Sequence, residues 1–472
     1  MTDRQNSDVA CRHAHFIGIG GIGMSGLAEL MLESGYEVSG SDLRRTQLTD
    51  RLSGLGASVF HSHDPGNAAG ADLIVYSSAI PEDNPELEAA RRHGVRSVRR
   101  AELLGMLMRG ARSIAVAGAH GKTSTSAMIV NVLAAAGLDP TAAIGGIMTE
   151  NGSNVRHGSG SWMVAEADEY DRSFHALAPT TAVITSVDAD HLEYYGSQEA
   201  IDAAFTTFAH LVPEDRPLFV CADDPGIRRI SPALRRRLVT YGLSGHACIR
   251  ADRVTSEGWS VSAEVFVRDV PAGRLVLPQP GECNLVNALA AIGVADYLEI
   301  PAERTLTALA DYRGLRRRFE VLGRIHGVEV VDDYAHHPVE IEAALLALSN
   351  AGARRMFVIF QPHLFSRTQH LCREFGRVLG RFPAYRKIVT DVYPSRETPR
   401  EGVTGELIVR ASSAFGGGVA YMPDKNRIAT TLVDDLEKGD MVLTLGAGDI
   451  DEVGRQVCEL LRKRGVRSHA CI

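Results

Sequence analysis

Short apolar runs alternate with longer segments of helical periodicity along almost the whole chain. Apolar runs at residues 15–20, 113–117 and 162–165, for example, are each short enough for one buried strand. Segments between such runs repeat apolar residues at helical spacing, as residues 24–34 and 198–211 do. This alternation is typical of βα units and parallel sheets, so the pattern predicts an α/β protein.

The pattern divides into three blocks, which we take as three domains. The first covers residues 1–110. The second, residues 111–323, includes a stretch at 239–277 that alternates in period two and therefore predicts antiparallel strands. The third, residues 324–472, returns to alternating strands and helices. Further strands are expected at 36–40, 73–76, 181–185, 328–332, 356–360, 387–391 and 441–445, and further helices at 85–92, 127–136, 284–298, 338–349 and 367–381.

Composition narrows the class of protein. The chain has 472 residues, of which 45% are apolar and 23% charged, a balance typical of globular proteins and not of disordered or fibrous ones. A net charge of −8 argues against a nucleic-acid partner. No run reaches the ~18 apolar residues of a membrane span, and residues 1–12 lack a signal-peptide core, so we expect no membrane insertion. Seven cysteines without a CxxC pair fit reduced thiols in a cytoplasmic enzyme.

The strongest motif is the Gly-rich turn Gly118-Ala119-His120-Gly121-Lys122-Thr123-Ser124-Thr125, between a predicted strand and a predicted helix. Backbone amides of such a turn point at phosphate oxygens, and the helix N-terminus adds its positive end. Lys122 supplies a point charge for β- and γ-phosphates, and the Thr123 hydroxyl is suited to Mg²⁺. The turn has two residues between its glycines where the usual P-loop has four, so it is a variant of that motif.

A second Gly-rich turn, Gly18-Ile19-Gly20-Gly21-Ile22-Gly23, fits the dinucleotide fingerprint, and Asp42 follows at the end of the next predicted strand. The spacing alone suggests NAD. A nucleotide-sugar satisfies it equally, because any diphosphate can sit on a helix N-terminus. A close strand–helix crossing without a ligand is the third interpretation.

Carboxylates and histidines follow the strands of the second block. Glu166 comes directly after the strand at 162–165, at the sheet edge where ligands bind, so Thr123 and Glu166 make a sensible Mg²⁺ site. His191 is a plausible ligand for a second ion, although a lone histidine is more often a helix-capping or hydrogen-bonded residue. We interpret Glu169 and Asp171 as N-caps or a solvated turn.

The third block has its own candidates at a strand end. Asp333-Tyr334-Ala335-His336-His337-Pro338 lies before a helix, and adjacent histidines point in different directions, which favours a substrate-binding turn over a metal site. The basic run Arg316-Arg317-Arg318 is either a solvated face or, beside an ATP site, the source of a bidentate phosphate clamp.

Several of these motifs together resemble one family. They are His15 to Gly26, Gly118 to Thr125, Ala165-Glu166-Ala167-Asp168-Glu169, Asp188-Ala189-Asp190-His191-Leu192, Arg317-Arg318-Phe319-Glu320, Asp333 to Pro338, Gln361-Pro362-His363 and Gly446-Ala447-Gly448-Asp449-Ile450. In this order, and over essentially the whole chain, they are similar to the Mur ligases of peptidoglycan synthesis. The resemblance implies a Rossmann-like N-terminal domain that binds a UDP-sugar, a central P-loop-type ATPase domain and a Rossmann-like C-terminal domain that takes the amino acid.

The implied reaction is ATP-dependent, ADP-forming ligation of L-alanine to the lactyl carboxylate of UDP-N-acetylmuramate, through an acyl phosphate and with Mg²⁺. The implied catalytic residues are Lys122, His191, Arg318 and His336. The implied ATP contacts are Gly118, Ala119, His120, Gly121, Lys122, Thr123, Ser124, Asn284, Asn287 and Asp333. The implied UDP-sugar contacts are Gly20, Gly21, Gly23, Met24, Ser25, Asp42, Ser77 and Ser78. The implied amino-acid contacts are His336 and Arg367, and the implied metal ligands are Thr123, Glu166 and His191.

Three alternatives stay open at this point. A ligase that attaches a ready-made tripeptide to the same UDP-sugar has similar motifs. A nicotinamide-dependent nucleotide-sugar oxidoreductase accounts for residues 18–23 but leaves residues 118–125 unexplained. A nucleotide-binding sensor without catalysis is disfavoured by the intact set of Lys122, Thr123 and Glu166. The chain also departs from the family, with Cys283 where a histidine is usual and no lysine between residues 196 and 212 to be carbamylated.

Overall fold

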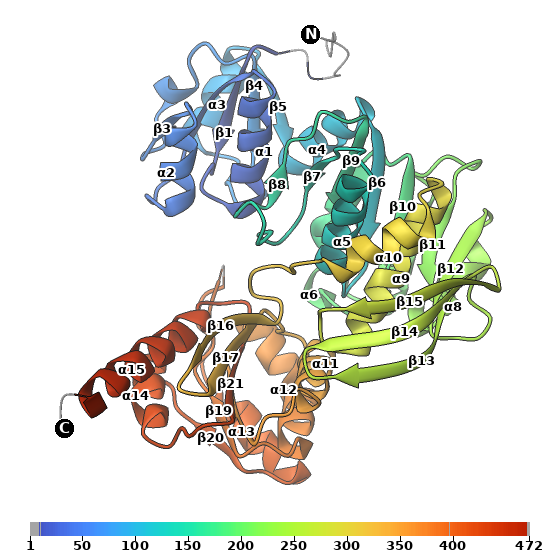
Figure 1. The fold of residues 1–472 in the computed structure, drawn as a ribbon. Coiled ribbons are helices and arrows are strands. Elements are labelled where there is room, and N and C mark those ends of the chain that lie inside the picture. The colour runs from blue at the N-terminus through green and yellow to red at the C-terminus, as the bar shows by residue number, and fades with distance from the viewer. Residues whose placement is uncertain (1–8, 10, 396, 470–472) are drawn as a thin grey trace. The chain divides into compact units, whose positions relative to one another are not determined.

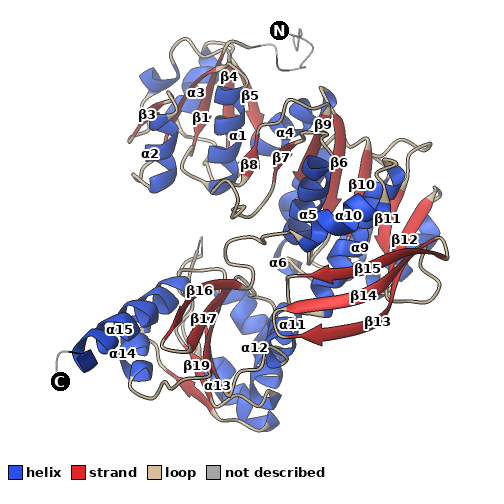
Figure 2. Cartoon of the chain, in the orientation of Figure 1, coloured by secondary structure: helices blue, strands red, loops and turns tan. Residues whose placement is uncertain are grey.

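A computed structural model describes residue 9 and residues 11–395 and 397–469. The chain separates into two compact units. The first comprises Met1–Arg253, Ala263–Val276 and Val286–Arg313, and the second comprises Val254–Ser262, Leu277–Leu285 and Gly314–Ile472. Three sheets carry the architecture, with helices packed alongside each of them (Figures 1 and 2). Among the described residues, no helix is both long and apolar enough to cross a bilayer.

The first sheet is five parallel strands in the order β3-β2-β1-β4-β5. Its chain order reverses between β1 and β4, and in open α/β sheets such a switch point, at the carboxyl ends of the strands, is where ligands bind. The first Gly-rich turn leaves β1 at this point. The strands are β1 His13–Ile17, β2 Glu37–Ser41, β3 Ser58–Phe60, β4 Leu73–Tyr76 and β5 Arg96–Arg99, and the helices are α1 Ile22–Glu33, α2 Gln47–Gly54, α3 Pro85–Arg92 and α4 Arg100–Arg109.

The second sheet has ten strands, in the order β15-β14-β13-β12-β11-β10-β6-β9-β7-β8. The strand β6, which leads into the second Gly-rich turn, lies between β10 and β9, and both neighbours are parallel to it. Their carboxyl ends therefore meet at one edge. The strands are β6 Arg112–Ala117, β7 Thr141–Ala143, β8 Val155–Arg156, β9 Trp162–Glu166, β10 Thr181–Ile184, β11 Leu218–Cys221, β12 Leu238–Gly242, β13 Ile249–Glu257, β14 Ser260–Val267 and β15 Val270–Leu277. The helices are α5 Lys122–Ala135, α6 Leu192–Tyr195, α7 Gln198–Ala209, α8 Pro225–Ile230, α9 Glu282–Tyr297 and α10 Ala302–Ala310.

Two predictions for this region need correction. The stretch 239–277 is not antiparallel throughout, because β12 pairs in parallel with β11 and with β13. Only β13, β14 and β15 are joined by two-residue links, which are too short for a parallel crossover. The helix expected at 127–136 begins five residues earlier, at Lys122, because Gly121 adopts the left-handed conformation (φ 82°) and ends the turn directly at the helix.

Small residues allow the first and second sheets to pack together within the first unit. A Cβ at Gly105 on α4 would lie 2.1 Å from the carbonyl oxygen of Ala176, so only glycine fits there. Ser153 donates to Glu29 of α1 at 3.3 Å, and Asn154 donates to the carbonyl of Ile22 at 3.0 Å. These contacts tie the segment before β8 to the helix that follows the first Gly-rich turn.

The third sheet has six strands in the order β16-β17-β21-β18-β19-β20. All neighbours are parallel except β16 and β17, which form an antiparallel pair. The carboxyl ends of β17, β21 and β18 lie side by side and carry the polar motifs of the third block. The strands are β16 Glu320–Ile325, β17 Val328–Asp333, β18 Arg355–Phe360, β19 Arg386–Val389, β20 Val419–Tyr421 and β21 Asp440–Leu445. The helices are α11 Pro338–Ser349, α12 Phe365–Arg381, α13 Glu406–Ser412, α14 Ile428–Val433 and α15 Asp451–His469.

Candidate active site

The Gly118–Gly121 turn is braced from the neighbouring strand β10. Gly118 has φ 142°, and a Cβ there would lie 1.9 Å from the Thr185 hydroxyl, so both the backbone and the available space require glycine. The amide of His120 donates to the Ser186 hydroxyl at 2.9 Å, and the amide of Ala119 donates to the Ser186 carbonyl at 3.2 Å. The turn is thus fixed before any ligand arrives.

Lys122, the first residue of α5, has its ammonium group beside a buried carboxylate. Its Nζ donates to Glu169 at 2.8 Å and to the carbonyl of Gly118 at 2.5 Å. Burial alone would lower the pKa of Lys122, but the carboxylates of Glu169, Glu166 and Asp168 outweigh burial and raise it above its ordinary value. The side chain is therefore a fixed positive charge at the helix N-terminus.

Glu169 was interpreted above as an N-cap or part of a solvated turn. It does occupy the N-cap position of the short helix Tyr170–Ala176, but its side chain makes no capping hydrogen bond and is not solvated. Its side chain is 4% exposed and pairs with Lys122. The sequence signal was present but weak: Glu169 follows β9 by three residues, and β9 lies next to β6. Loop residues follow no periodic sequence pattern, so the burial of a polar loop side chain cannot be predicted from the sequence.

Thr123 and Glu166 come together as predicted for a cation site. The Thr123 hydroxyl donates to Glu166 at 3.2 Å, and the other carboxylate oxygen accepts from the amide of Gly145 at 2.6 Å. A Cβ at Gly145 would lie 2.7 Å from both carboxylate oxygens, so the backbone approaches Glu166 as closely as it can. Hydroxyl and carboxylate oxygens are the donors that Mg²⁺ prefers.

His191 lies in a different group of polar side chains. Ligand atoms of His191, Glu169 and Asp190 all lie within 4.8 Å of one another. His191 adopts φ 58°, and its ring meets Tyr170 edge-on at 5.2 Å between centroids. A left-handed backbone at a non-glycine residue costs free energy, so the surrounding contacts hold this histidine in place.

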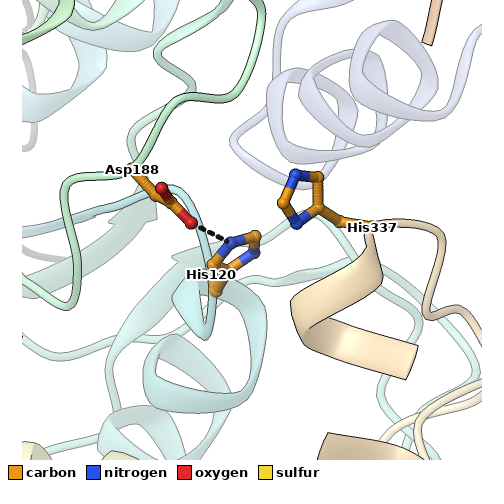
Figure 3. Close-up of side chains that lie close together, drawn as sticks. All are labelled: His120, Asp188 and His337. Atoms are coloured by element: carbon orange, nitrogen blue, oxygen red, sulfur yellow. Dashed lines mark hydrogen bonds and ion pairs between the residues drawn. The ribbon is translucent and has the colours of Figure 1, made fainter. Parts of the chain in front are cut away.

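Two further residues border the turn. His120 Nε2 lies 3.3 Å from an Asp188 carboxylate oxygen, which is the contact drawn as a dashed line in Figure 3. Asn287 on α9 accepts from the Thr125 hydroxyl at 3.2 Å, and a Cβ at Gly121 would lie 2.6 Å from its Oδ1. Asn287 therefore packs against the Gly118–Thr125 turn, and the family resemblance implies ATP contacts for both.

The first Gly-rich turn is held by the end of β2. The amides of Gly18 and Ile19 donate to the Ser41 carbonyl at 2.8 and 3.0 Å, and Gly20 donates to the Asp42 carboxylate at 2.9 Å. Asp42 therefore shapes the turn itself. The remaining predicted residues lie on the elements that meet at this edge of the sheet. Gly21 caps α1, Gly23, Met24 and Ser25 are in its first turn, and Ser77 and Ser78 follow β4.

Asn284, Cys283 and Asp333 belong to the second unit. Asn284 is buried and donates to the carbonyl of Pro280 at 2.8 Å, which fixes the start of α9. Its neighbour Cys283 is exposed. Asp333 is 3% exposed and accepts from the amides of Phe319 and Ala335 at 2.9 and 2.8 Å.

Two of the three arginines in the basic run before β16, Arg317 and Arg318, lie over the ring of Tyr334. Arg317 donates to Asp332 at 2.9 Å and to the carbonyls of Gly448 and Gly446 at 2.6 and 2.7 Å, so it pins the chain to the loop after β21. The guanidinium of Arg318 is 5.3 Å from the Tyr334 ring centroid, and that of Arg317 is 5.1 Å from it. Arg317 has a structural role in the second unit that the sequence pattern did not reveal.

His336 and Arg367 lie at the same edge of the third sheet. His336 Nδ1 is 3.0 Å from the carbonyl oxygen of Tyr334, and its ring lies 5.9 Å from that of His363. Arg367, in the first turn of α12, is 8% exposed. His337 serves instead as the N-cap of α11 with Glu340, so the two adjacent histidines do differ in their surroundings.

Fold and site together define a nucleotide-phosphate-binding α/β protein with a lysine-containing turn. Comparison with protein families matches residues 13–112 to "Mur ligase family, catalytic domain", 116–295 to "Mur ligase middle domain" and 317–448 to "Mur ligase, glutamate ligase domain". The chain belongs to the Mur ligase family and has its N-terminal, middle and C-terminal domains. The boundaries at 110 and 323 stay predictions.

Individual relatives cover almost the full length. The UDP-N-acetylmuramate–L-alanine ligase of Geotalea daltonii is 43% identical, over 95% of this chain and 98% of that protein. The crystal structure of the UDP-N-acetylmuramate–alanine ligase of Thermotoga maritima is 29% identical with a TM-score of 0.80, over 96% and 99% of the two chains. A murein peptide ligase from Psychrobacter arcticus is 22% identical with a TM-score of 0.69, over 95% and 98%, and shares the fold.

Proposed function

We propose that the protein joins L-alanine to the lactyl carboxylate of UDP-N-acetylmuramate with conversion of ATP to ADP, in peptidoglycan precursor synthesis. The observation that carries the proposal is the charged Lys122 beside Thr123 and Glu166 at the N-terminus of α5, in a chain of this family. A soluble nucleotide-sugar and ATP are both available in the cytoplasm, where we place the reaction.

The reaction has two steps. A lactyl carboxylate oxygen attacks the γ-phosphorus, the bond from this phosphorus to the β,γ-bridging oxygen breaks, and ADP leaves an acyl phosphate behind. The alanine amine then attacks the acyl carbon and phosphate leaves. The ammonium of Lys122 and the amides of the turn stabilise charge that moves onto the β- and γ-phosphate oxygens.

Thr123 and Glu166 fit a magnesium ion, because both offer hard oxygen atoms next to the phosphate turn. When bound, the ion neutralises charge on the β- and γ-phosphates. His191 is proposed for a second ion. Without a bound ion, Lys122 and Arg100 would have to balance the negative charges of Glu166, Asp168 and Glu169. The Arg100 guanidinium is 3.7 Å from Asp168.

The other assignments are proposals from the family resemblance. Arg318 would contact the γ-phosphate and Asp333 the nucleotide, while His336 and Arg367 would take the amino acid. The first turn would hold the UDP diphosphate on the N-terminus of α1. Membership of a ligase family disfavours the nicotinamide-dependent oxidoreductase as the explanation of this turn.

The acceptor assay separates the remaining candidates. Phosphate release from ATP is measured with UDP-N-acetylmuramate and, in separate reactions, alanine, glycine, serine or the tripeptide, and the control omits the UDP-sugar. We expect release with alanine that depends on the UDP-sugar. Release with the tripeptide and with none of the amino acids would establish the recycling ligase instead, and no release with any acceptor would support a sensor.

A further inference from the structure

Glu169 is a buried carboxylate that none of the proposed steps uses. It lies three residues after β9, and its side chain is 4% exposed. Burying a carboxylate costs free energy unless a positive partner is provided. Lys122 is that partner, at 2.8 Å.

The Lys122 ammonium has three hydrogens, and its acceptors account for all of them. Besides Glu169, these acceptors are the carbonyls of Gly118 at 2.5 Å and Ala119 at 3.4 Å. Both carbonyls belong to the turn that would surround the phosphates. The ammonium must therefore exchange these partners for phosphate oxygens when a nucleotide binds.

If the Lys122 ammonium shifts toward the phosphates, Glu169 cannot move with it, because the backbone of Glu169 is held in place by hydrogen bonds. Its carbonyl accepts from the Tyr195 hydroxyl at 2.5 Å and from the amide of Arg172 at 3.1 Å. Asp171 and Arg172 are both left-handed, with φ 51° and 60°, and the Arg172 guanidinium lies 5.7 Å from the Tyr195 ring centroid. The segment after Glu169 is thus held tightly enough to impose unfavourable backbone conformations.

We propose that Glu169 is a positioning residue for Lys122. The Glu169 carboxylate holds the Lys122 ammonium in place beside the turn and competes with nucleotide phosphates for it. This competition lowers the affinity for the nucleotide in the ground state, before phosphoryl transfer begins. The fixed position directs the remaining donors of the ammonium toward the phosphates, where charge increases during phosphoryl transfer. The inference depends on the proposed ATP site.

The competition predicts an unusual pair of effects for Glu169→Gln. The neutral amide no longer competes for the ammonium, so ADP should bind about 3- to 10-fold more tightly. The ammonium also loses its fixed orientation, so kcat should fall about 10-fold or more while KM for ATP does not rise. Glu169→Asp keeps the charge and should return ADP affinity toward that of the wild type.

The experiment uses the full chain and titrates ADP by calorimetry without any acceptor, followed by kcat and KM for ATP in the ligase assay. The matched control is Asp440→Asn. Asp440 is also buried and charge-paired, to Arg355 at 2.5 Å, but it lies at the start of β21. Its loss should lower the melting temperature without changing the dissociation constant of ADP.

Tighter ADP binding together with a lower kcat in Glu169→Gln, with recovery in Glu169→Asp, supports the proposal. Weaker ADP binding accompanied by a lower melting temperature, as for any structural residue, would overturn it. Unchanged ADP affinity and unchanged kcat would overturn it as well. Failure of the wild type to bind ADP would instead refute the nucleotide site itself.

Discussion

The two Gly-rich turns begin alike and differ in what lies around them. Each leaves a central parallel strand and enters a helix, α1 or α5. In the first turn, the amide of Gly20 donates to the carboxylate of Asp42, and residues 18–23 contain no positively charged side chain. In the second turn, Lys122 carries a fixed charge, and Thr123 contacts Glu166.

In the proposed function the first turn holds a diphosphate that does not react, for which a turn and a helix N-terminus are enough. Transfer of a phosphoryl group moves charge onto oxygens and requires cations at that place. The first turn is therefore suited to binding, and the second to chemistry. Variants of the two turns should separate the two roles.

Lys122→Ala should have the largest effect. We expect kcat to fall by roughly 10²–10³-fold or more, because the fixed charge at the phosphates is lost. UDP-sugar affinity should survive, because the first turn is unchanged. Calorimetry with the UDP-sugar and the phosphate-release assay measure the two quantities on the same protein. Loss of both would mean that the roles of the two turns are misassigned.

Gly20→Ala should affect the first turn alone. The new Cβ would lie 2.7 Å from Asp42 Oδ2, which forces the carboxylate away from its hydrogen bond to the backbone. We expect UDP-sugar affinity to fall roughly 10-fold with ADP affinity unchanged, as the cost of one disrupted, partly buried hydrogen bond. Gly54→Ala, where a Cβ would meet nothing within 4 Å, is the matched control. Equal losses for both ligands would remove the distinction between the turns.

The smallest expected effect is an acid sensitivity of the first turn. Ser41, whose carbonyl holds this turn, donates its hydroxyl to the buried Glu86 at 2.5 Å. Burial alone would raise the pKa of Glu86, but the His15 ring at 3.6 Å and hydrogen bonds from Ser41 and Asn67 lower it to about 2. The folded state then binds fewer protons than the unfolded state, so stability present above the unfolded pKa is lost as the pH falls toward 2.

Melting temperatures measured from about pH 5 to about pH 3 test this, with Glu86→Gln as the comparison. The wild type should lose more stability over this range than Glu86→Gln, in which the group no longer titrates. Equal pH slopes for the two proteins would contradict the role of Glu86. The same comparison for ADP binding should show little difference, because the second turn has no contact of this kind with Glu86.

Local signals explain how much of the site was predictable. The Gly-rich turns were identified because φ near 80° at Gly18 and Gly121 restricts the choice of residue, and this restriction is visible in the sequence. Thr123 and Glu166 were paired because both follow strands whose ends meet at one sheet edge. The helix at Lys122 was placed five residues late, because the polar residues of its first turn hide the periodicity.

By itself, the sequence determined the alternating α/β architecture, the two Gly-rich turns and the family to which the chain belongs. The tertiary structure alone decided which polar residues are buried beside them: Glu169 at Lys122, Asn287 at Thr125 and Arg317 at Asp332. Lys122 and Glu169 are 47 residues apart. Their pairing depends on the order of strands β6 and β9 in the sheet, and such long-range pairing leaves no periodic pattern in the chain.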